Sequence, residues 1–279
     1  MKDRYGREID YLRISITDRC NLRCVYCMPK DGIHQISHKE ILTYDEIKRV
    51  CQCVTTLGIH KIKLTGGEPL TRKNCSELVA MVKALPGIEK VTLTTNGVLL
   101  KDQLKDLAEA GIDNINISLD TLNKTEFHRI TRREGLSSVL ESIEEALKYP
   151  QIGLKINCVP VIEDPENLVS IAGLAKTHPI HVRFIEMMPI GFGKDFVFRG
   201  EDEICSILER AYGIMIPDVN RYGNGPCHYY QIQEFQGRIG FISAMTHKFC
   251  DQCNRVRMTA EGYLKACLQY QTGTDLKRL

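Results

Sequence analysis

The segment Leu12-Arg-Ile-Ser-Ile-Thr-Asp-Arg-Cys-Asn-Leu-Arg-Cys-Val-Tyr-Cys-Met-Pro29 joins a β-branched run to three closely spaced cysteines. The run 11–16 is typical of a β-strand, and Cys20, Cys24 and Cys27 follow it directly. Their loop therefore lies at the carboxyl end of this strand, where barrel enzymes place their chemistry. With 12 cysteines in 279 residues, this spacing arises by chance with a probability on the order of 0.002. The segment predicts a strand followed by a thiolate site.

Outward from this segment, β-branched runs alternate with helical stretches through the first two thirds of the chain. Further strands are predicted at 61–65, 91–95, 114–118, 154–159 and 181–185. Thr43 and Glu46 form a capping box at a helix start, Gly58 marks that helix's end, and Gly111 closes the helix that begins near Lys101. Six βα units in series predict parallel strands, in an open doubly wound sheet or in a complete or partial barrel.

The alternation of predicted strands and helices ends after about Gly191. A helix is predicted at 201–212, then a Gly/Pro-rich turn at 223–226 and antiparallel strands at 229–235 and 238–243. We therefore expect two regions, 1–195 and 196–279, with a loose boundary between them.

Charge and hydropathy argue against several classes of protein. The net charge is +2 and no run of five like charges occurs, which disfavours nucleic-acid and membrane-surface binding. Residues 1–10 lack an apolar core, and no stretch approaches 18 apolar residues, so we expect neither export nor membrane insertion. Twelve cysteines without a secretory signal favour a cytoplasmic protein whose thiols are free to bind metals.

The first cysteine triple places three thiols within eight residues and has no adjacent fourth. This pattern favours a four-iron cluster with one iron left open for a ligand. The alternative is a structural zinc site that borrows a distant side chain such as His34.

The second triple is Cys250, Cys253 and Cys267, again without an adjacent fourth thiol. A cluster is favoured here too, but zinc competes more strongly. Three nearby side chains could complete a tetrahedral zinc site: Cys227, His228 and His247.

Cations interrupt four of the apolar strand runs: Arg13, Lys61, Lys63, Lys155 and Arg183. Alternation puts Lys61 and Lys63 on one face of their strand, and an unpaired buried cation costs several kcal/mol. If these side chains point into a barrel, an anion such as a triphosphate must meet them. The alternative is that some face solvent or pair with acids such as Glu186.

Six segments together resemble the GTP 3′,8-cyclase family, the radical S-adenosylmethionine (SAM) enzymes that begin molybdenum cofactor biosynthesis. The resemblance starts with the Leu12–Pro29 segment and covers nearly the whole chain. It continues through Thr65-Gly-Gly-Glu-Pro69, Thr94-Thr-Asn-Gly97, Ile117-Ser-Leu-Asp120, Arg183-Phe-Ile-Glu-Met-Met-Pro189 and Phe249-Cys-Asp-Gln-Cys-Asn-Arg-Val-Arg-Met258.

The resemblance implies an α/β fold, a partial (β/α)6 TIM-type barrel with a smaller C-terminal α+β extension that carries the second cluster. It implies a lyase with two [4Fe-4S] clusters and SAM as cofactors. The first cluster and SAM generate a 5′-deoxyadenosyl radical, which takes the hydrogen from C3′ of GTP; attack on C8 then gives 3′,8-cyclo-7,8-dihydro-GTP. The open iron of the second cluster is expected to hold the guanine.

The family pattern also assigns ligand contacts to positions of this sequence. SAM is expected against Tyr26, Gly67, Ser118 and Met188, with Met187 as the alternative to Met188. GTP is expected against Arg13, Lys63, Thr94, Lys155, Arg255 and Arg257. Gly66 and Gly67 at a strand end would let backbone approach a ligand, with a tight turn as the alternative reading. Arg255 and Arg257 could form a fork beside the second cluster or an exposed strand face.

The resemblance suggests a flavodoxin or ferredoxin as electron donor, a homodimer, and cyclic pyranopterin monophosphate synthase as the next enzyme. Lys63 stands where the family pattern has Arg, which keeps the charge but loses bidentate geometry. Family members usually end in a Gly-Gly tail, some tens of residues beyond the point where this sequence stops. We expect that difference to affect turnover more than cluster or ligand binding.

Two other functions fit parts of the pattern. One is a peptide-modifying radical SAM enzyme with an auxiliary cluster, whose substrate would not need the cations. The other is a non-catalytic nucleotide-binding module in which both triples hold zinc.

Overall fold

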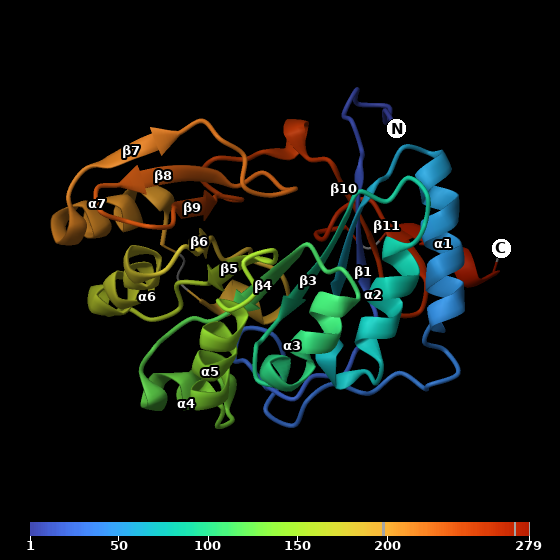
Figure 1. Cartoon of the computed structure of the whole chain (residues 1–279), viewed down its shortest axis with the longest axis horizontal. Helices are drawn as coiled ribbons and strands as arrows, with labels where there is room; N and C mark the ends of the chain where they lie inside the picture. Colours follow the sequence, from blue (N-terminus) through green and yellow to red (C-terminus); the bar gives the residue numbers. More distant parts are fainter. Residues whose placement is uncertain (197–198, 271, 279) are drawn as a thin grey trace.

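The computed structural model describes residues 1–196, 199–270 and 272–278. Its centre is a row of six parallel strands, neighbours in the order of the sequence (Figure 1). They are β1 (Tyr11–Ser15), β2 (Lys61–Thr65), β3 (Lys90–Thr95), β4 (Asn114–Ser118), β5 (Gly153–Cys158) and β6 (His181–Ile185). All six predicted strands are confirmed.

The helices follow the strands and lie along the outside of the sheet, where α1, α2, α3 and α5 pack side by side (Figure 1). They are α1 (Tyr44–Thr56), α2 (Cys75–Lys83), α3 (Leu100–Glu109), α4 (Lys124–Thr131), α5 (Leu136–Ala146), α6 (Pro165–Thr177) and α7 (Glu201–Tyr212). The predicted capping box of α1 is confirmed: Glu46 N donates to Thr43 Oγ1 over 3.2 Å, and Thr43 N donates to Glu46 Oε2 over 2.6 Å.

The two faces of the sheet differ in polarity because side chains alternate along each strand. The residues that face the helices are apolar and fully or almost fully buried, among them Leu12, Ile14, Ile62, Leu64 and Leu93. Their neighbours Arg13, Lys63 and Asn116 point to the other side. Branched apolar side chains usually fill the inside of a (β/α)8 barrel. In this protein the hydrophobic core lies between sheet and helices, and the inner face is polar.

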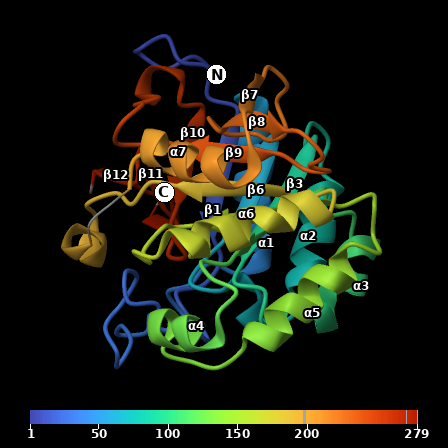
Figure 2. The ribbon, with the colours of Figure 1, turned by 90° about the vertical axis from the view of Figure 1, so that its left-hand side faces the viewer.

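The chain after β6 extends both edges of this sheet (Figure 2). On one side β9 (Ile239–Ile242) pairs in parallel with β6, and β8 (His228–Ile232) and β7 (Met215–Asp218) continue antiparallel. On the other side β10 (Arg255–Met258) pairs in parallel with β1, followed by antiparallel β11 (Tyr263–Lys265) and β12 (Gly273–Asp275).

These pairings confirm the predicted antiparallel strands and add what the sequence did not indicate. The sheet runs without interruption across residue 195, because β9 and β10 join strands that precede it. Within the described residues, no helix is long and apolar enough to cross a bilayer.

Candidate active site

The first cysteine triple occupies the loop that leaves the carboxyl end of β1, as predicted. The end of α4 holds this loop: Arg23 N donates to Thr131 O and Val25 N to Ile130 O, both over 2.9 Å. The Arg132 guanidinium adds a bond of 3.0 Å to Met28 O. Helix α4 therefore fixes the path of the loop, although no sequence signal indicated that contact.

The segment Thr65-Gly-Gly-Glu-Pro69 packs against the start of the same loop. Gly67 N donates to Thr17 O over 2.8 Å, and Glu68 N donates to Arg19 O over 2.7 Å. A Cβ on Gly67 would lie 2.3 Å from Arg19 O, and one on Gly66 would lie 2.7 Å from Thr17 O. The glycines are therefore required for contact between two backbones, a reason that the sequence analysis did not give.

The Glu68 carboxylate is buried and connects this segment to the end of β3. It accepts hydrogen bonds from Thr95 Oγ1, Asn96 N and Leu70 N at 2.7, 2.6 and 3.1 Å. Burial raises its pKa, and these three bonds favour the charged form. Glu68 thus links the 65–69 segment to the end of β3 and holds in place the segment on which the first cysteine loop packs.

The first three thiols interact electrostatically with one another and with Asp120. Burial, Asp120 and Cys20 raise the pKa of Cys27 to about 11. Burial, Cys27, Asp120 and Cys20 raise the pKa of Cys24. Three thiolates beside a carboxylate need positive charge to balance them, and the iron ions of an iron–sulfur cluster provide it. The donor set fits such a cluster.

The side chains expected to meet SAM lie around this loop, at the carboxyl ends of β2, β4 and β6. Gly67 follows β2, Ser118 ends β4, and Met188 follows β6. Tyr26 lies in the loop itself, and its hydroxyl donates to Asp120 Oδ2 over 2.6 Å. Met187 packs closely against Gly193, where a Cβ would be 2.9 Å from its sulfur.

A cavity of 320 Å³ opens on the inner face of the sheet. Seven cationic residues line it, and none of the described lining residues is Asp or Glu. The cations are Arg13, Lys63, Lys90, Lys155, Arg183, Arg221 and Arg255. A cavity of this composition attracts a strongly anionic ligand.

Strand register explains why these side chains meet. In the ladder, Arg13 of β1 lies opposite both Lys63 of β2 and Arg257 of β10. Lys155 of β5 lies opposite Asn116 of β4, which in turn lies opposite Thr94 of β3. Residues opposite each other in a ladder share one face, so their side chains point into the same space.

The positive charges in the cavity repel one another. Burial, then Arg183, Arg13 and other cations, lower the pKa of Lys63 well below its usual value. Burial and Arg183 lower the pKa of Lys155 to about 7. The Nε atoms of Arg13 and Arg255 are buried and have no hydrogen-bond partner in the described structure. A bound polyanion would reduce this repulsion and accept hydrogen bonds from the two unpaired Nε groups.

Five of the six residues expected to contact GTP line this cavity: Arg13, Lys63, Thr94, Lys155 and Arg255. Arg257 is not among the lining residues. Its pKa is lowered to about 9 by burial, Arg13 and Arg255, whereas Cys267 and Cys253 act in the opposite direction. Arg257 therefore lies between the cation cluster and the second cysteine triple.

Lys61 and Arg183 had no settled role from sequence. Lys61 is not among the residues that line the cavity; it pairs with Asp10 at 2.5 Å, so of the two alternatives left open the pairing with an acid holds for this residue. Arg183 does line the cavity, and its Nη2 donates to Asn116 Oδ1 at 2.8 Å and to Asn157 Oδ1 at 2.5 Å. Glu186 accepts from the backbone of Met245 and Thr246 instead of pairing with a cation.

Three parts of the cavity lining were not predicted from the sequence: Asn116, Asn157 and the loop 221–227. The two asparagines occupy inward strand positions, so the alternation that indicated the cations could have found them. The loop was predicted only as a turn. Nothing local in its sequence connects it to the cavity.

The second cysteine triple lies at the opposite end of the cavity. Cys250 begins the short helical turn η3 (Cys250–Gln252), Cys253 precedes β10, and Cys267 follows β11. Burial alone would raise the pKa of Cys253, but the adjacent Arg255, helped by Arg7, lowers it. A stabilised thiolate is the form that binds iron or zinc.

The side chains that could have completed a zinc site with this triple have other partners. His228 Nε2 lies 2.5 Å from Glu201 Oε1, and His247 Nδ1 lies 3.5 Å from Glu201 Oε2. Cys227 lines the cation-rich cavity. His34, the alternative ligand for the first triple, is exposed beside Gln35 O. In the described part of the chain, no three His, Cys, Asp or Glu side chains, those of the two cysteine triples included, are grouped closely enough to hold one metal ion, so this finding does not distinguish zinc from a cluster.

The two triples are separated along β1. Cys20 follows Ser15 at the carboxyl end, whereas Cys253 precedes Arg255, which pairs with Tyr11 at the amino end. Four residue steps of a strand span about 13 Å, to which the loops add. A ligand in the cavity therefore lies between two thiol sites.

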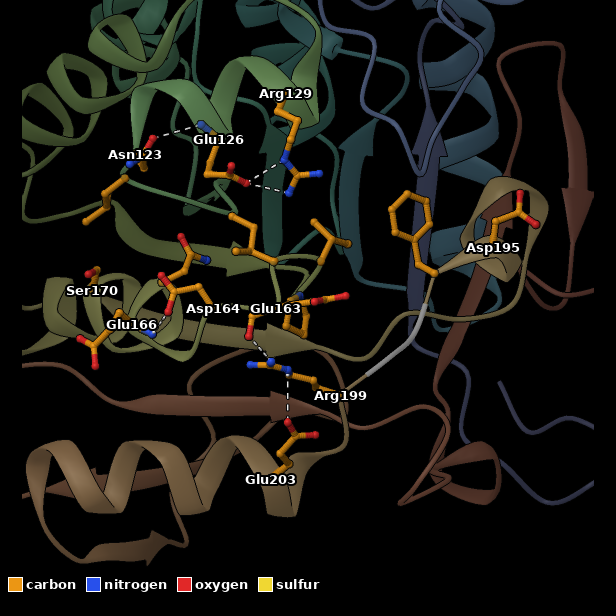
Figure 3. A pocket seen from close by; sticks show the side chains of 16 residues that line it. Asn123, Glu126, Arg129, Glu163, Asp164, Glu166, Ser170, Asp195, Arg199 and Glu203 are labelled. Atoms are coloured by element: carbon orange, nitrogen blue, oxygen red, sulfur yellow. Dashed lines mark hydrogen bonds and ion pairs between the residues drawn. The ribbon is translucent and has the colours of Figure 1, made fainter.

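A second, larger cavity of 1410 Å³ lies where the loop after β5 faces α4 and α6 (Figure 3). Figure 3 shows Arg199 between the Glu163 carbonyl and Glu203, and Arg129 paired with Glu126. Of the eight charged residues that line it, six are acidic. Phe196 on its rim makes an edge contact with Tyr26, at 6.5 Å between ring centres, so this cavity adjoins the first cysteine loop.

Comparison with known proteins agrees with this arrangement. Residues 14–175 match the model of the radical SAM superfamily, and residues 180–279 match the model of the molybdenum cofactor synthesis C-terminal region. The chain is 47% identical over 279 residues to a GTP 3′,8-cyclase of Clostridium perfringens strain SM101, covering 99% of this chain and 86% of that protein. It is 43% identical to a GTP 3′,8-cyclase of Pelotomaculum thermopropionicum, with the same coverage.

Solved structures resemble the fold at low sequence identity. The structure of Streptococcus suis SuiB bound to S-adenosylmethionine matches with a TM-score of 0.70 and 13% identity, covering 98% of this chain and 64% of that one. Methylornithine synthase matches with a TM-score of 0.52 and 21% identity, covering 66% of this chain and 55% of that one. These matches support the radical SAM fold alone.

Proposed function

This chain belongs to the GTP 3′,8-cyclase family of the radical SAM superfamily, and from that premise we propose how its residues convert GTP to 3′,8-cyclo-7,8-dihydro-GTP. It is a lyase of molybdenum cofactor biosynthesis that uses SAM and a [4Fe-4S] cluster. The observation that carries the substrate assignment is the cavity lined by seven cations and, among the residues that the structure describes, by no carboxylate. A nucleoside triphosphate matches that charge, whereas a peptide substrate would not require it.

Cys20, Cys24 and Cys27 hold the first cluster in this proposal. Tyr26, Gly67, Ser118 and Met188 surround SAM, supported by their common position at the carboxyl ends of the strands. When bound, the cluster and SAM would supply the one-electron chemistry and the radical needed to remove the C3′ hydrogen of GTP. The backbone contacts with α4 and the hydrogen bonds of Glu68 keep the first cysteine loop in place for this chemistry.

Arg13, Lys63, Thr94, Lys155 and Arg255 bind GTP in this proposal, with Arg257 at the end of the set. Arg13 and Arg255 supply unpaired donors to the phosphates, and Lys63 and Lys155 act as point charges. Arg183, oriented by Asn116 and Asn157, adds a further cation. The cations lie between the two thiol sites, so the nucleotide can extend toward both.

Cys250, Cys253 and Cys267 hold a second [4Fe-4S] cluster in this proposal. It is supported by the lowered pKa of Cys253 and by the engagement of His228 and His247 with Glu201. An open iron at this end would face the guanine. Residues 1–195 then form the radical SAM region and 196–279 the region of the second cluster.

The family resemblance supports three partners that no contact in the chain identifies. They are a flavodoxin or ferredoxin as electron donor, a second copy of the chain, and cyclic pyranopterin monophosphate synthase as the enzyme that consumes the product.

Anaerobic reconstitution tests the proposed function. About eight irons per chain indicate two four-iron clusters, and dithionite with SAM should then give 5′-deoxyadenosine that depends on GTP. Zinc without iron would overturn the radical mechanism. Iron with 5′-deoxyadenosine released only when a peptide is present would keep the superfamily and overturn the substrate.

A further inference from the structure

The loop 221–227 forms one wall of the cation-rich cavity, since every one of its residues lines that space. In the described structure its backbone makes no backbone-to-backbone hydrogen bond. Tyr222 anchors its beginning through a hydroxyl bond of 2.7 Å to Asp218 and a ring contact with His181. Gly223 and Gly225 leave the middle of the loop conformationally free. Something other than secondary structure must hold that middle in place.

Asn254 supplies a contact at that point. Its Nδ2 donates to the Asn224 carbonyl oxygen over 3.0 Å and to Asp10 Oδ1 over 2.6 Å. One amide nitrogen has two hydrogens, so both bonds form together. Asn254 lies between Cys253, a proposed cluster ligand, and Arg255, which lines the cavity.

Asp10 is itself fixed at the amino end of β1. Its other carboxylate oxygen pairs with Lys61 at 2.5 Å, and its backbone carbonyl accepts from His60 N and Lys61 N. The Asn254 carbonyl accepts in turn from Asp10 N and Tyr11 N, both over 3.2 Å. The contact is therefore built on the rigid central sheet, and it gives Lys61 a role outside the cavity.

We propose that Asp10 and Asn254 are positioning residues that latch the loop 221–227 over the amino-end opening of the barrel and so retain GTP. The proposal rests on the proposed use of this cavity for GTP. Breaking the latch frees the Asn224 carbonyl and lets the loop move away from the bound nucleotide. GTP then dissociates faster, whereas SAM, bound at the carboxyl end, is unaffected.

Two variants break the latch in different ways. Asn254→Asp keeps the shape but removes both donors and places a carboxylate beside Asp10. Asp10→Ala removes the acceptor that orients the Asn254 amide toward Asn224, and it substitutes no residue next to Cys253. Asp113→Ala is the matched control: Asp113 precedes β4 as Asp10 precedes β1, and its pair with Lys83 has a length of 2.6 Å and similar exposure.

Hydrogen exchange of the GTP-free protein is the first readout. We expect faster deuterium uptake across 221–227 in both latch variants, and uptake like the wild type in Asp113→Ala. The second readout is equilibrium binding without reductant. The dissociation constant for GTP should rise about tenfold, the effect of losing one or two hydrogen bonds, with SAM affinity and iron content unchanged.

Unchanged exchange of the loop in both variants would overturn the latch. An equal loss of GTP and SAM affinity would also overturn it, since that result indicates general damage. If Asn254→Asp loses iron because it adjoins Cys253, Asp10→Ala decides. If the wild type itself fails to bind GTP, the proposed function fails, and the exchange experiment still tests the latch separately.

Discussion

Lys155 shows how burial sets the chemistry of single residues in the cavity. Burial and Arg183 lower its pKa to about 7, far below that of an exposed lysine. The ammonium form is costly in this cavity because no described carboxylate lines it. A bound triphosphate supplies the missing negative charge and restores the charged form.

GTP binding should therefore take up protons above pH 7. The free protein holds Lys155 mostly neutral there, so affinity should fall as pH rises, by up to about tenfold per pH unit for one proton. Below pH 7 this residue is already charged and contributes no slope. Calorimetry at pH 6 and 8, in buffers of different ionisation enthalpy, measures the uptake.

The Lys155→Met variant serves as the control. The difference in proton uptake between the wild type and this variant excludes the protons taken up by the nucleotide and by Lys63, whose pKa is also lowered. Equal proton uptake at pH 8 by the wild type and Lys155→Met would contradict the role given to Lys155.

At the scale of elements, the turn after β2 and the loop after β1 depend on each other. The Gly67 backbone meets Thr17 and Arg19 so closely that a methyl group does not fit. The fold thereby couples the strand that carries Lys63 to the loop that carries the first cysteine triple.

Gly67→Ala should displace that loop. Overpacking of this kind costs typically about 2 kcal/mol, so the free energy of unfolding of the iron-free protein should fall by that amount in urea. Iron retained after reconstitution should fall as well. Gly225→Ala is the comparison, because a Cβ there meets nothing within 4 Å. Equal stability and iron content in the two variants would show that the contact is not tight.

At the scale of the molecule, the two triples lie at opposite ends of one cavity, which separates their functions. Replacing Cys250, Cys253 and Cys267 by Ala should weaken GTP binding but leave about four irons and, at saturating GTP, dithionite-driven SAM cleavage. Replacing the first triple should abolish SAM cleavage and preserve GTP binding. Iron analysis, 5′-deoxyadenosine release and GTP binding measure the three effects. Loss of SAM cleavage in both sets would refute this separation.

Much of this architecture follows from sequence because the signals are local. The β-branched runs predicted all six central strands, and alternation put Lys61 and Lys63 on one face of their strand, since the side-chain period of a strand is two residues. The Thr43 capping box and both cysteine triples are fixed by spacing over a few residues. The resemblance to the family then indicated the cofactors and the substrate.

The sequence by itself thus determined the strands, the positions of the two cysteine triples and the positive charge of the cavity. Only the tertiary structure decided how they meet. Pairing of β10 with β1 brings Asn254 to Asp10, which is 244 residues away in the chain, and Lys61 turns to Asp10 instead of the cavity. Parallel pairing between distant segments depends on register and packing of the whole sheet, and no local pattern of residues encodes it.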